Sequence, residues 1–155
     1  MNDAMHPLSE EEEAAWRSLA RLLTVLPRVL EVDLQKAARI SMTEYAVLMS
    51  LSEAPDRQLG MSELAARAGV SPSRTSRIVD AFAEQGLITR SRSAGDGRSN
   101  VAALTDAGFA RLRDAYPAHL ASVRHRVVQH LDGVDLPALT AAFEAVDRAA
   151  GSRNR

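Results

Sequence analysis

The chain has 155 residues, of which 46% are hydrophobic and 25% are charged, and its formal net charge is −1. This length and composition are typical of one soluble globular domain with helical extensions, and the absence of cysteine from the sequence excludes disulfides, thiolate metal ligands and cysteine-based redox sensing. The acidic run at residues 10–13 stands where a signal peptide would be basic, and no apolar run has the length of a membrane span. We therefore expect a cytoplasmic protein that does not enter a membrane.

The charged residues are unevenly distributed along the chain. Residues 1–35 contain seven acidic and three basic side chains, whereas residues 61–101 contain four acidic and six basic ones. A net charge near zero argues against a uniformly basic surface. The local excess of arginine in residues 61–101 therefore indicates the segment that is best suited to a polyanion.

A long amphipathic helix is predicted at the N-terminus. Ser9 and Glu12 have the spacing of a capping box, which begins a helix that runs to about residue 37. Its apolar residues follow each other at steps of three and four, as expected for one continuous stripe. Pro27 lies inside this helix and is expected to kink it or to split it in two. The stripe consists of Trp16, Leu19, Leu23, Leu26 and Leu30.

Two shorter helices and a hairpin are predicted in the middle of the chain. Ser41 and Glu44 form a second capping box, whose helix ends near residue 53, and the segment SELAARA predicts a short helix that stops at Gly69. Further along, Asp96–Gly97 is a dipeptide typical of hairpin turns, so strands are expected at about residues 87–91 and 100–104.

The helix between these segments is the best candidate for a functional element. Ser71–Pro72 predicts its start, with serine as N-cap and proline in the first turn, and Gly86 is the expected glycine just past its end. Together with the preceding short helix and glycine-containing turn, it fits a helix-turn-helix, whose second helix packs one face and presents the other to the DNA major groove.

The two faces of this helix can be assigned at about 100° per residue. Thr75, Ile78, Val79 and Phe82 fall on one buried stripe. Ser73, Ser76 and Arg77 fall on the opposite face in the first two turns, where base contacts are expected, and Arg74 lies on the flank, suited to a phosphate. Asp80 and Glu84 share the outward face but lie deeper along the helix. The alternative is an amphipathic helix whose polar face is merely solvated.

The hairpin is interpreted as a wing that reaches the adjacent minor groove. Arg98, at its tip, would enter that groove, drawn by the negative potential of a narrow minor groove. Arg90 and Arg92 lie on the strand that approaches the tip and are suited to phosphates. The alternative is a solvated turn whose arginines contact nothing.

Helices are also predicted at the C-terminus. Thr105 is the expected cap of a long helix over residues 106–131 that contains Pro117, and Asp135 begins a last helix. Leu136, Leu139, Phe143 and Val146 form the apolar stripe of this last helix. One small lobe cannot cover both terminal stripes, so we expect a homodimer. A twofold dimer would bind a near-palindromic operator with half-sites about 10 bp apart.

The sequence resembles the multiple-antibiotic-resistance regulator (MarR) family over nearly its whole length. The resemblance rests on SELAARAGVSPSRTSRIVDAFAEQGLITR, on the wing segment RSRSAGDGRS and on the LTDAG that follows. It implies that Asp96 holds the wing and that Arg98 enters the minor groove. It also implies DNA contacts from residues of the recognition helix, namely Ser71, Ser73, Arg74, Ser76 and Arg77.

The expected fold class is mainly α, a winged helix-turn-helix with a two-stranded wing and flanking dimerisation helices. We expect one domain over residues 1–155, with a DNA-binding lobe at 41–104 and dimerisation helices at 8–37 and 106–150. The resemblance further implies a homodimer and a crevice for a small aromatic acid between the dimer base and the lobes. Trp16 and Tyr45 are candidates for that crevice, with plain core packing as the alternative.

Nothing in the sequence indicates an enzyme, a metal site or a cofactor. The spacing of His119, His125 and His130 does not place any two of them within reach of one ion on a helix. No phosphate loop, nucleotide fingerprint or nucleophile motif is present. We therefore expect a homodimeric repressor that binds double-stranded DNA and is released by a small ligand. The alternatives are a ligand-independent architectural DNA-binding protein and a protein–protein module that has lost its DNA contacts.

Overall fold

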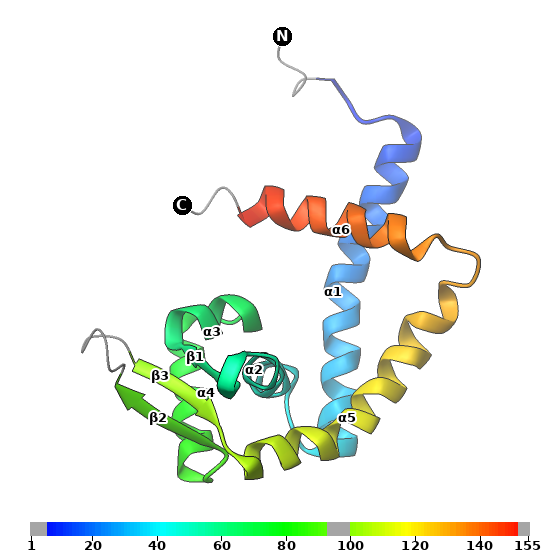
Figure 1. Cartoon of the computed structure of the whole chain (residues 1–155). Helices are drawn as coiled ribbons and strands as arrows, with labels where there is room; N and C mark the ends of the chain where they lie inside the picture. Colours follow the sequence, from blue (N-terminus) through cyan, green and yellow to red (C-terminus); the bar gives the residue numbers. More distant parts are fainter. Residues whose placement is uncertain (1–5, 93–99, 152–155) are drawn as a thin grey trace. The chain divides into compact units, whose positions relative to one another are not determined.

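The computed structural model of the chain describes residues 6–92 and 100–151, and its elements are shown from blue to red in Figure 1. The chain divides into two compact units, Met1–Ser122 and Val123–Arg155. No helix among the described residues has both the length and the apolar character needed to cross a membrane. The helices are α1 (Glu10–Ala38), α2 (Met42–Ser52), α3 (Met61–Ala68), α4 (Pro72–Glu84), α5 (Asp106–Arg126) and α6 (Leu136–Gly151), with short 3-10 turns η2 (Pro55–Arg57) and η3 (Val128–His130).

Both predicted capping boxes are confirmed. The Ser9 hydroxyl accepts from the Glu12 amide at 3.2 Å, while the Glu12 carboxylate accepts from the Ser9 amide at 2.8 Å. Ser41 and Glu44 make the same pair of bonds at the same distances. These boxes satisfy amide groups that the first turn of a helix cannot satisfy by itself.

Pro27 does not split the first helix, which was one of the two expectations, and a kink at this residue stays a prediction. α1 runs from Glu10 to Ala38 with Pro27 inside it. A proline removes one backbone hydrogen bond, and in a helix of 29 residues the turns on both sides keep theirs.

The long helix predicted for residues 106–131 ends earlier than expected. α5 stops at Arg126, and Val127 takes a non-helical conformation before the 3-10 turn η3. Two consecutive β-branched residues, Val127 and Val128, have low helix propensity, which accounts for the early end. The predicted starts are confirmed, because the Thr105 hydroxyl accepts from the Gly108 amide and the Asp135 carboxylate accepts from the Ala138 amide, both at 3.0 Å.

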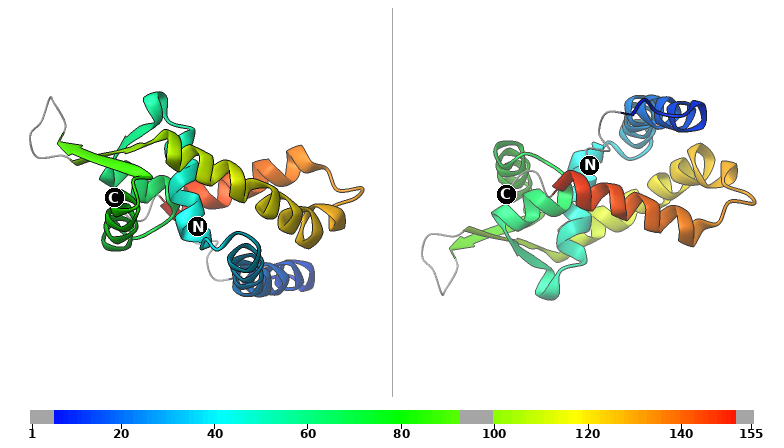
Figure 2. Two further views of the ribbon diagram at one scale, coloured as in Figure 1. Left: turned by 90° about the horizontal axis from the view of Figure 1, so that it is seen from below. Right: turned by 90° about the horizontal axis from the view of Figure 1, so that it is seen from above.

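The sheet has three strands rather than the two expected from the sequence. β1 (Gln58–Gly60) pairs antiparallel with β3 (Asn100–Leu104), which pairs on its other side with β2 (Ile88–Arg92). β2 and β3 lie side by side and extend away from the helices of their unit (Figures 1 and 2). β1 was missed because three residues are too short to show the alternation that identifies a strand.

The core of the first unit lies where α2, α3, α4 and β3 meet. Leu48, Leu64, Val79 and Ala102, one from each of these elements, have no exposed surface. The predicted inward face of α4 is confirmed for Thr75, Val79 and Phe82, which are buried, while Ile78 of the same predicted stripe is half-buried. Because the buried face of α4 is fixed in the core, the opposite face is directed to solvent.

Polar contacts join α5 to the end of α1 within this unit. Nη2 of Arg111 donates to the carbonyl oxygens of Ala38 and Arg39, at 2.6 and 3.0 Å. Eleven residues further along α5, the Ser122 hydroxyl donates to the Asp33 carboxylate at 2.7 Å. Carbonyl groups at a helix C-terminus have no partner within the helix, so Arg111 satisfies two groups that would otherwise require water.

Gly108 lies where the first turn of α5 packs closely against Leu87 and Leu104. It is buried in the first turn of α5, and a Cβ atom there would lie 2.1 Å from the carbonyl oxygen of Leu87 and 2.6 Å from Cδ1 of Leu104. The first of these neighbours is backbone and cannot move without displacing the start of β2. Only glycine therefore fits this position.

We expect Gly108→Ala to lower the free energy of unfolding by about 3 kcal/mol, because the added methyl group overpacks the junction of α5 with β2. Urea denaturation followed by circular dichroism measures this change. The matched control is Gly60→Ala, because a Cβ at Gly60 would meet nothing within 4 Å and its φ is negative. Equal unfolding midpoints for the two variants would contradict this packing.

Candidate nucleic-acid interface

The start of α4 is held in one conformation by local bonds. The Ser71 hydroxyl accepts from the Arg74 amide at 3.4 Å, and Pro72 occupies the first turn, as predicted. The Thr75 hydroxyl, which is fully buried, donates to the carbonyl oxygen of Ser71 at 3.0 Å. Gly69 ends α3 at a φ of 64°, which lets the chain turn directly into α4.

The outward face of α4 carries hydroxyl and guanidinium groups in its first two turns. Ser73 and Arg77 are exposed and Ser76 is half-buried, which is the placement predicted from the helical period. Arg74 is exposed on the flank, where its Nη2 donates to the Thr43 hydroxyl of α2 at 3.2 Å. This face presents hydrogen-bond donors and positive charge to solvent over the N-terminal half of the helix.

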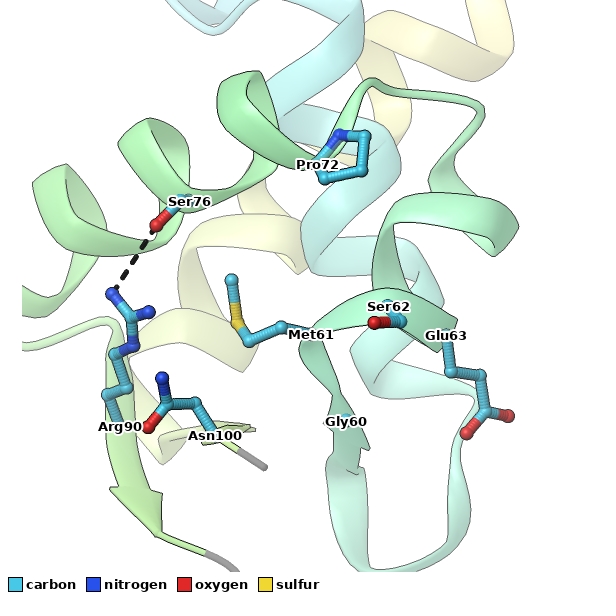
Figure 3. Close-up of a pocket in the computed structure, with 8 residues that line it drawn as sticks. All are labelled: Gly60, Met61, Ser62, Glu63, Pro72, Ser76, Arg90 and Asn100. Atoms are coloured by element: carbon cyan, nitrogen blue, oxygen red, sulfur yellow. Dashed lines mark hydrogen bonds between the residues drawn. The ribbon is translucent and has the colours of Figure 1, made fainter. Parts of the chain in front are cut away.

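Arg90 of β2 is joined to α4 by an ion pair that the sequence analysis did not anticipate. Its Nη1 atom contacts the Asp80 carboxylate and lies 3.5 Å from the Ser76 hydroxyl, the bond drawn as a dashed line in Figure 3. Ser76 and Asp80 are four residues apart and so share one face of α4. The sequence shows that these two residues share a helical face, but it does not show which strand residue lies opposite them.

A pocket of about 550 Å³ lies beside this ion pair. One wall is α4, through Pro72 and Ser76, and another is the hairpin, through Arg90 and Asn100. Residues 60–63, which join β1 to the first turn of α3, complete the lining. Figure 3 shows the Arg90 guanidinium and the Asn100 amide on the same side of this space, across from the start of α3.

The remaining wing residues of the predicted site lie largely outside the described part of the chain. Asp96 and Arg98 fall outside the described residues, and so does the side chain of Arg92, whose backbone ends β2. Among the predicted residues that are described, the structure brings Ser76 and Arg90 into contact. It also places the hydroxyls of Ser71 and Ser73 3.4 Å apart.

The two candidates for an effector crevice occupy different surroundings. Tyr45 is buried and stacks on His119 of α5 with a ring-centroid distance of 4.5 Å, and its hydroxyl has no hydrogen-bond partner among the described residues. Burial raises the pKa of the Tyr45 hydroxyl and lowers the pKa of the His119 imidazole.

Trp16 is exposed and far from Tyr45 within one chain. The contact of α1 with the start of α2 is made by Glu31, whose carboxylate accepts from the Met42 amide at 2.7 Å. At about 1.5 Å per residue, Trp16 is about 22 Å along the helix from Glu31. The two aromatic side chains therefore do not line one pocket of a single chain.

Histidine and acidic side chains are scattered over the described residues. No group of three or more of them within residues 6–92 and 100–151 has the arrangement needed to hold a metal ion.

Two solved structures are similar to this chain over nearly its full length. Sco3205, a MarR family transcriptional regulator from Streptomyces coelicolor whose structure is in complex with DNA, is 33% identical with a TM-score of 0.85, over 96% of this chain and 92% of that one. AbsC, a MarR family transcriptional regulator from the same organism, is 30% identical with a TM-score of 0.84, over 96% of this chain and 99% of AbsC.

A curated relative and a family model give the same assignment. The HTH-type transcriptional repressor YetL from Bacillus subtilis (strain 168) is 31% identical over 84 residues, which are 54% of this chain. The match spans 50% of the length of YetL. The model of the MarR family matches residues 40–100, the segment from two residues before α2 to the first residue of β3. Together with the two full-length similarities, this match shows that the chain belongs to the MarR family.

Proposed function

We propose that this chain is a homodimeric repressor of transcription, and not an enzyme, which binds a near-palindromic DNA operator and is released by a small ligand. One observation carries the proposal, namely the exposed hydroxyl and guanidinium groups at the start of a helix whose other face is fixed in the core. The DNA complex of Sco3205 and the repressor role printed for YetL support it.

In this proposal α4 enters the major groove by its N-terminal half. Arg77 donates to the O6 and N7 atoms of a guanine, while Ser73 and Ser76 allow close approach to the base edges. Arg74 and the hydroxyl of Ser71 lie at the edge of this face and contact phosphates, which set the register of the helix on the duplex. Glu84 lies further along α4, away from the bases.

The β2–β3 hairpin reaches the neighbouring minor groove in the same proposal. Arg98 enters that groove, where a narrow width concentrates negative potential, and Asp96 holds the tip. Arg92 contacts the backbone on the way. These roles follow from the family resemblance and from the order of the residues along the hairpin.

The proposed homodimer rests on apolar surface that a single chain leaves exposed. On α1, Leu23 and Val32 are each 63% exposed, and Trp16 is also exposed. On α6, Leu136, Phe143 and Val146 are each about half exposed. Exposed apolar surface of this extent is typical of a protein–protein interface, and self-association through one twofold axis buries it in both copies. Two copies then present two recognition helices to two half-sites.

The proposed effector site uses Tyr45, which belongs to α2 of the DNA-binding lobe and stacks on α5. A buried hydroxyl without a partner costs free energy that a ligand acceptor would recover. An acidic aromatic ligand that inserts beside Tyr45 would stack on the same rings and accept from that hydroxyl. By moving α2 against α5, it would change the spacing of the two lobes and lower affinity for a two-site operator.

Arg77→Ala and Arg98→Ala are each expected to lower operator affinity by about 1–3 kcal/mol, because each removes a guanidinium from a groove. Fluorescence anisotropy with a duplex selected in vitro by this protein, and with a shuffled duplex of equal length, measures the loss. Arg77→Ala should also reduce the preference for the selected duplex. Glu84→Ala is the control, since it removes an exposed acidic side chain of the same face and should not weaken binding. Unchanged affinity of both arginine variants would refute the proposed contacts.

Leu23→Glu is expected to raise the dissociation constant of the homodimer at least about tenfold, because a carboxylate would be buried in the interface. Sedimentation velocity over a range of concentrations measures the monomer–dimer equilibrium. Thr24→Glu is the matched control, because Thr24 is exposed on the neighbouring, arginine-bearing side of α1. A wild-type chain that sediments as a monomer, or equal effects of the two variants, would rule out this interface.

A small aromatic carboxylate is expected to release the protein from its selected duplex, and Tyr45→Phe should raise the concentration required. This variant keeps the ring that stacks on His119 and removes only the hydroxyl, for which residues 6–92 and 100–151 offer no hydrogen-bond partner. The measurement is anisotropy of the bound duplex during titration with a panel of such acids. If none releases the duplex, the effector proposal fails for this class of ligand and the ligand-independent architectural alternative is favoured.

A further inference from the structure

Two histidines at the end of α5 face one small group. His125 lies in the last turn of α5, and His130 ends the 3-10 turn η3. Nδ1 of His125 and Nε2 of His130 each lie 3.2 Å from the side-chain amide nitrogen of Gln129. All three residues belong to the second compact unit, Val123–Arg155, so their mutual placement is a property of one unit. Two ring nitrogens from different turns therefore converge on one point.

The early end of α5 brings these two rings together. On a continuous helix, the spacing of five residues would place His125 and His130 about 140° apart around the axis. The helix instead stops at Arg126, Val127 takes a φ of −127° and a ψ of −66°, and the chain continues as a 3-10 turn. The separation expected of these two histidines is therefore wrong, because it assumed a helix that continues to residue 131.

The bonds to Gln129 determine which ring nitrogens carry a lone pair. An amide nitrogen has two N–H donors and no acceptor, so Nδ1 of His125 and Nε2 of His130 both accept. Each ring then carries its proton on the other nitrogen. A neutral imidazole that presents a lone pair is the form of histidine that binds a metal ion. A cation in the place of this amide would meet two such lone pairs.

Little else holds the two rings in place. Both histidines and Gln129 are exposed, and among the described residues neither ring has a hydrogen-bond partner other than Gln129. A bond from a zinc-like ion to imidazole is about 2.0–2.1 Å long, so each ring nitrogen has to move about 1 Å toward the point where the amide nitrogen lies. Rotation of an exposed imidazole covers this distance readily, because its χ2 angle has a broad distribution.

The donor set selects the class of ion. Imidazole nitrogen suits Cu²⁺, Ni²⁺ and Zn²⁺, whereas Mg²⁺ and Ca²⁺ prefer oxygen ligands. Within residues 6–92 and 100–151 no group of three or more His, Cys, Asp or Glu side chains is arranged for a metal, so water completes the coordination of an ion at this pair. Arg124 and Arg126 adjoin His125 in the chain, but on the helix they project about 100° to either side of it.

We propose that His125 and His130 bind one divalent ion of this class, Cu²⁺ more tightly than Zn²⁺, and that the amide of Gln129 moves aside when the ion enters. The ion joins the last turn of α5 to η3 across the break at Val127. The pair lies outside the residues proposed to contact DNA or an aromatic ligand, so this inference does not depend on the proposed function.

Calorimetric titration of the full-length chain with Cu²⁺ in a non-coordinating buffer tests the site. We expect saturation at one ion per chain and an affinity that falls at least about tenfold in His125→Gln and in His130→Gln, since loss of even an outer-shell partner of a metal has an effect of that size. Zn²⁺ should bind more weakly than Cu²⁺, and Mg²⁺ should not bind.

His6→Gln is the control for this titration, because His6 is an exposed histidine near the N-terminus and outside the pair. Circular dichroism confirms that all three variants are folded. Electron paramagnetic resonance of the wild type with less than one Cu²⁺ per chain should show hyperfine coupling to two imidazole nitrogens. Binding that does not saturate, or equal affinities of His6→Gln and the two variants of the pair, would overturn the site.

A variant with an added ligand tests the convergence of the two rings. Gln129→Glu places a carboxylate at the point that both ring nitrogens face, and a carboxylate is a further ligand for Zn²⁺, so the affinity for Zn²⁺ should rise at least about tenfold. Val128→Glu is the matched control, because Val128 is also exposed and the variant adds the same charge one residue away. If the two variants change the affinity equally, the rings do not share an ion and the inference is wrong.

Discussion

The burial of one face of α4 is the constraint on which the rest of the interface depends. Val79 and Phe82 pack into the core formed with α2, α3 and the sheet, and the buried hydroxyl of Thr75 bonds back to Ser71. Rotation of the helix by one residue would expose these side chains and bury Arg77, which is energetically prohibitive. The outward direction of Ser73 and Arg77 is therefore a consequence of packing and requires no contact of their own.

The same packing explains why the hairpin lies beside α4. Gly86 takes a φ of 72° just after the helix, and the Leu87 amide donates to the carbonyl oxygen of Phe82 at 2.9 Å, so the chain reverses into β2 at once. Asp80, on the exposed face, then meets Arg90 on the strand. An exposed ion pair contributes little to stability, so we interpret its role as alignment of the guanidinium rather than as stabilisation of the fold.

Sequence patterns predicted the elements whose signals are local, and missed what depends on tertiary contacts. Ser9, Ser41 and Ser71 identified helix starts because each cap is formed within four residues. The faces of α4 followed from the helical period. β1 was missed because it exists only through pairing with β3, and the continuity of α1 through Pro27 depends on the turns that flank it. The Asp80–Arg90 pair required knowledge of which strand lies beside α4, a relation between residues ten positions apart that periodicity does not contain.

A chain of net charge −1 can still present a basic face if the acidic side chains near that face are paired with cations and other arginines there are not paired with acids. Two of the acidic side chains near the candidate interface, Glu63 and Asp80, are each paired with an arginine, Arg67 and Arg90. Arg74 bonds instead to a neutral hydroxyl, so its charge is not cancelled by that contact. Coulomb interactions are screened beyond about 8 Å at physiological ionic strength. A phosphate at this surface therefore responds to the nearby guanidinium groups and not to the acidic first turn of α1, which contributes most of the negative excess in residues 1–35. Affinity for a polyanion is in this way decided by the arrangement of a few side chains around α4, which net charge does not reveal.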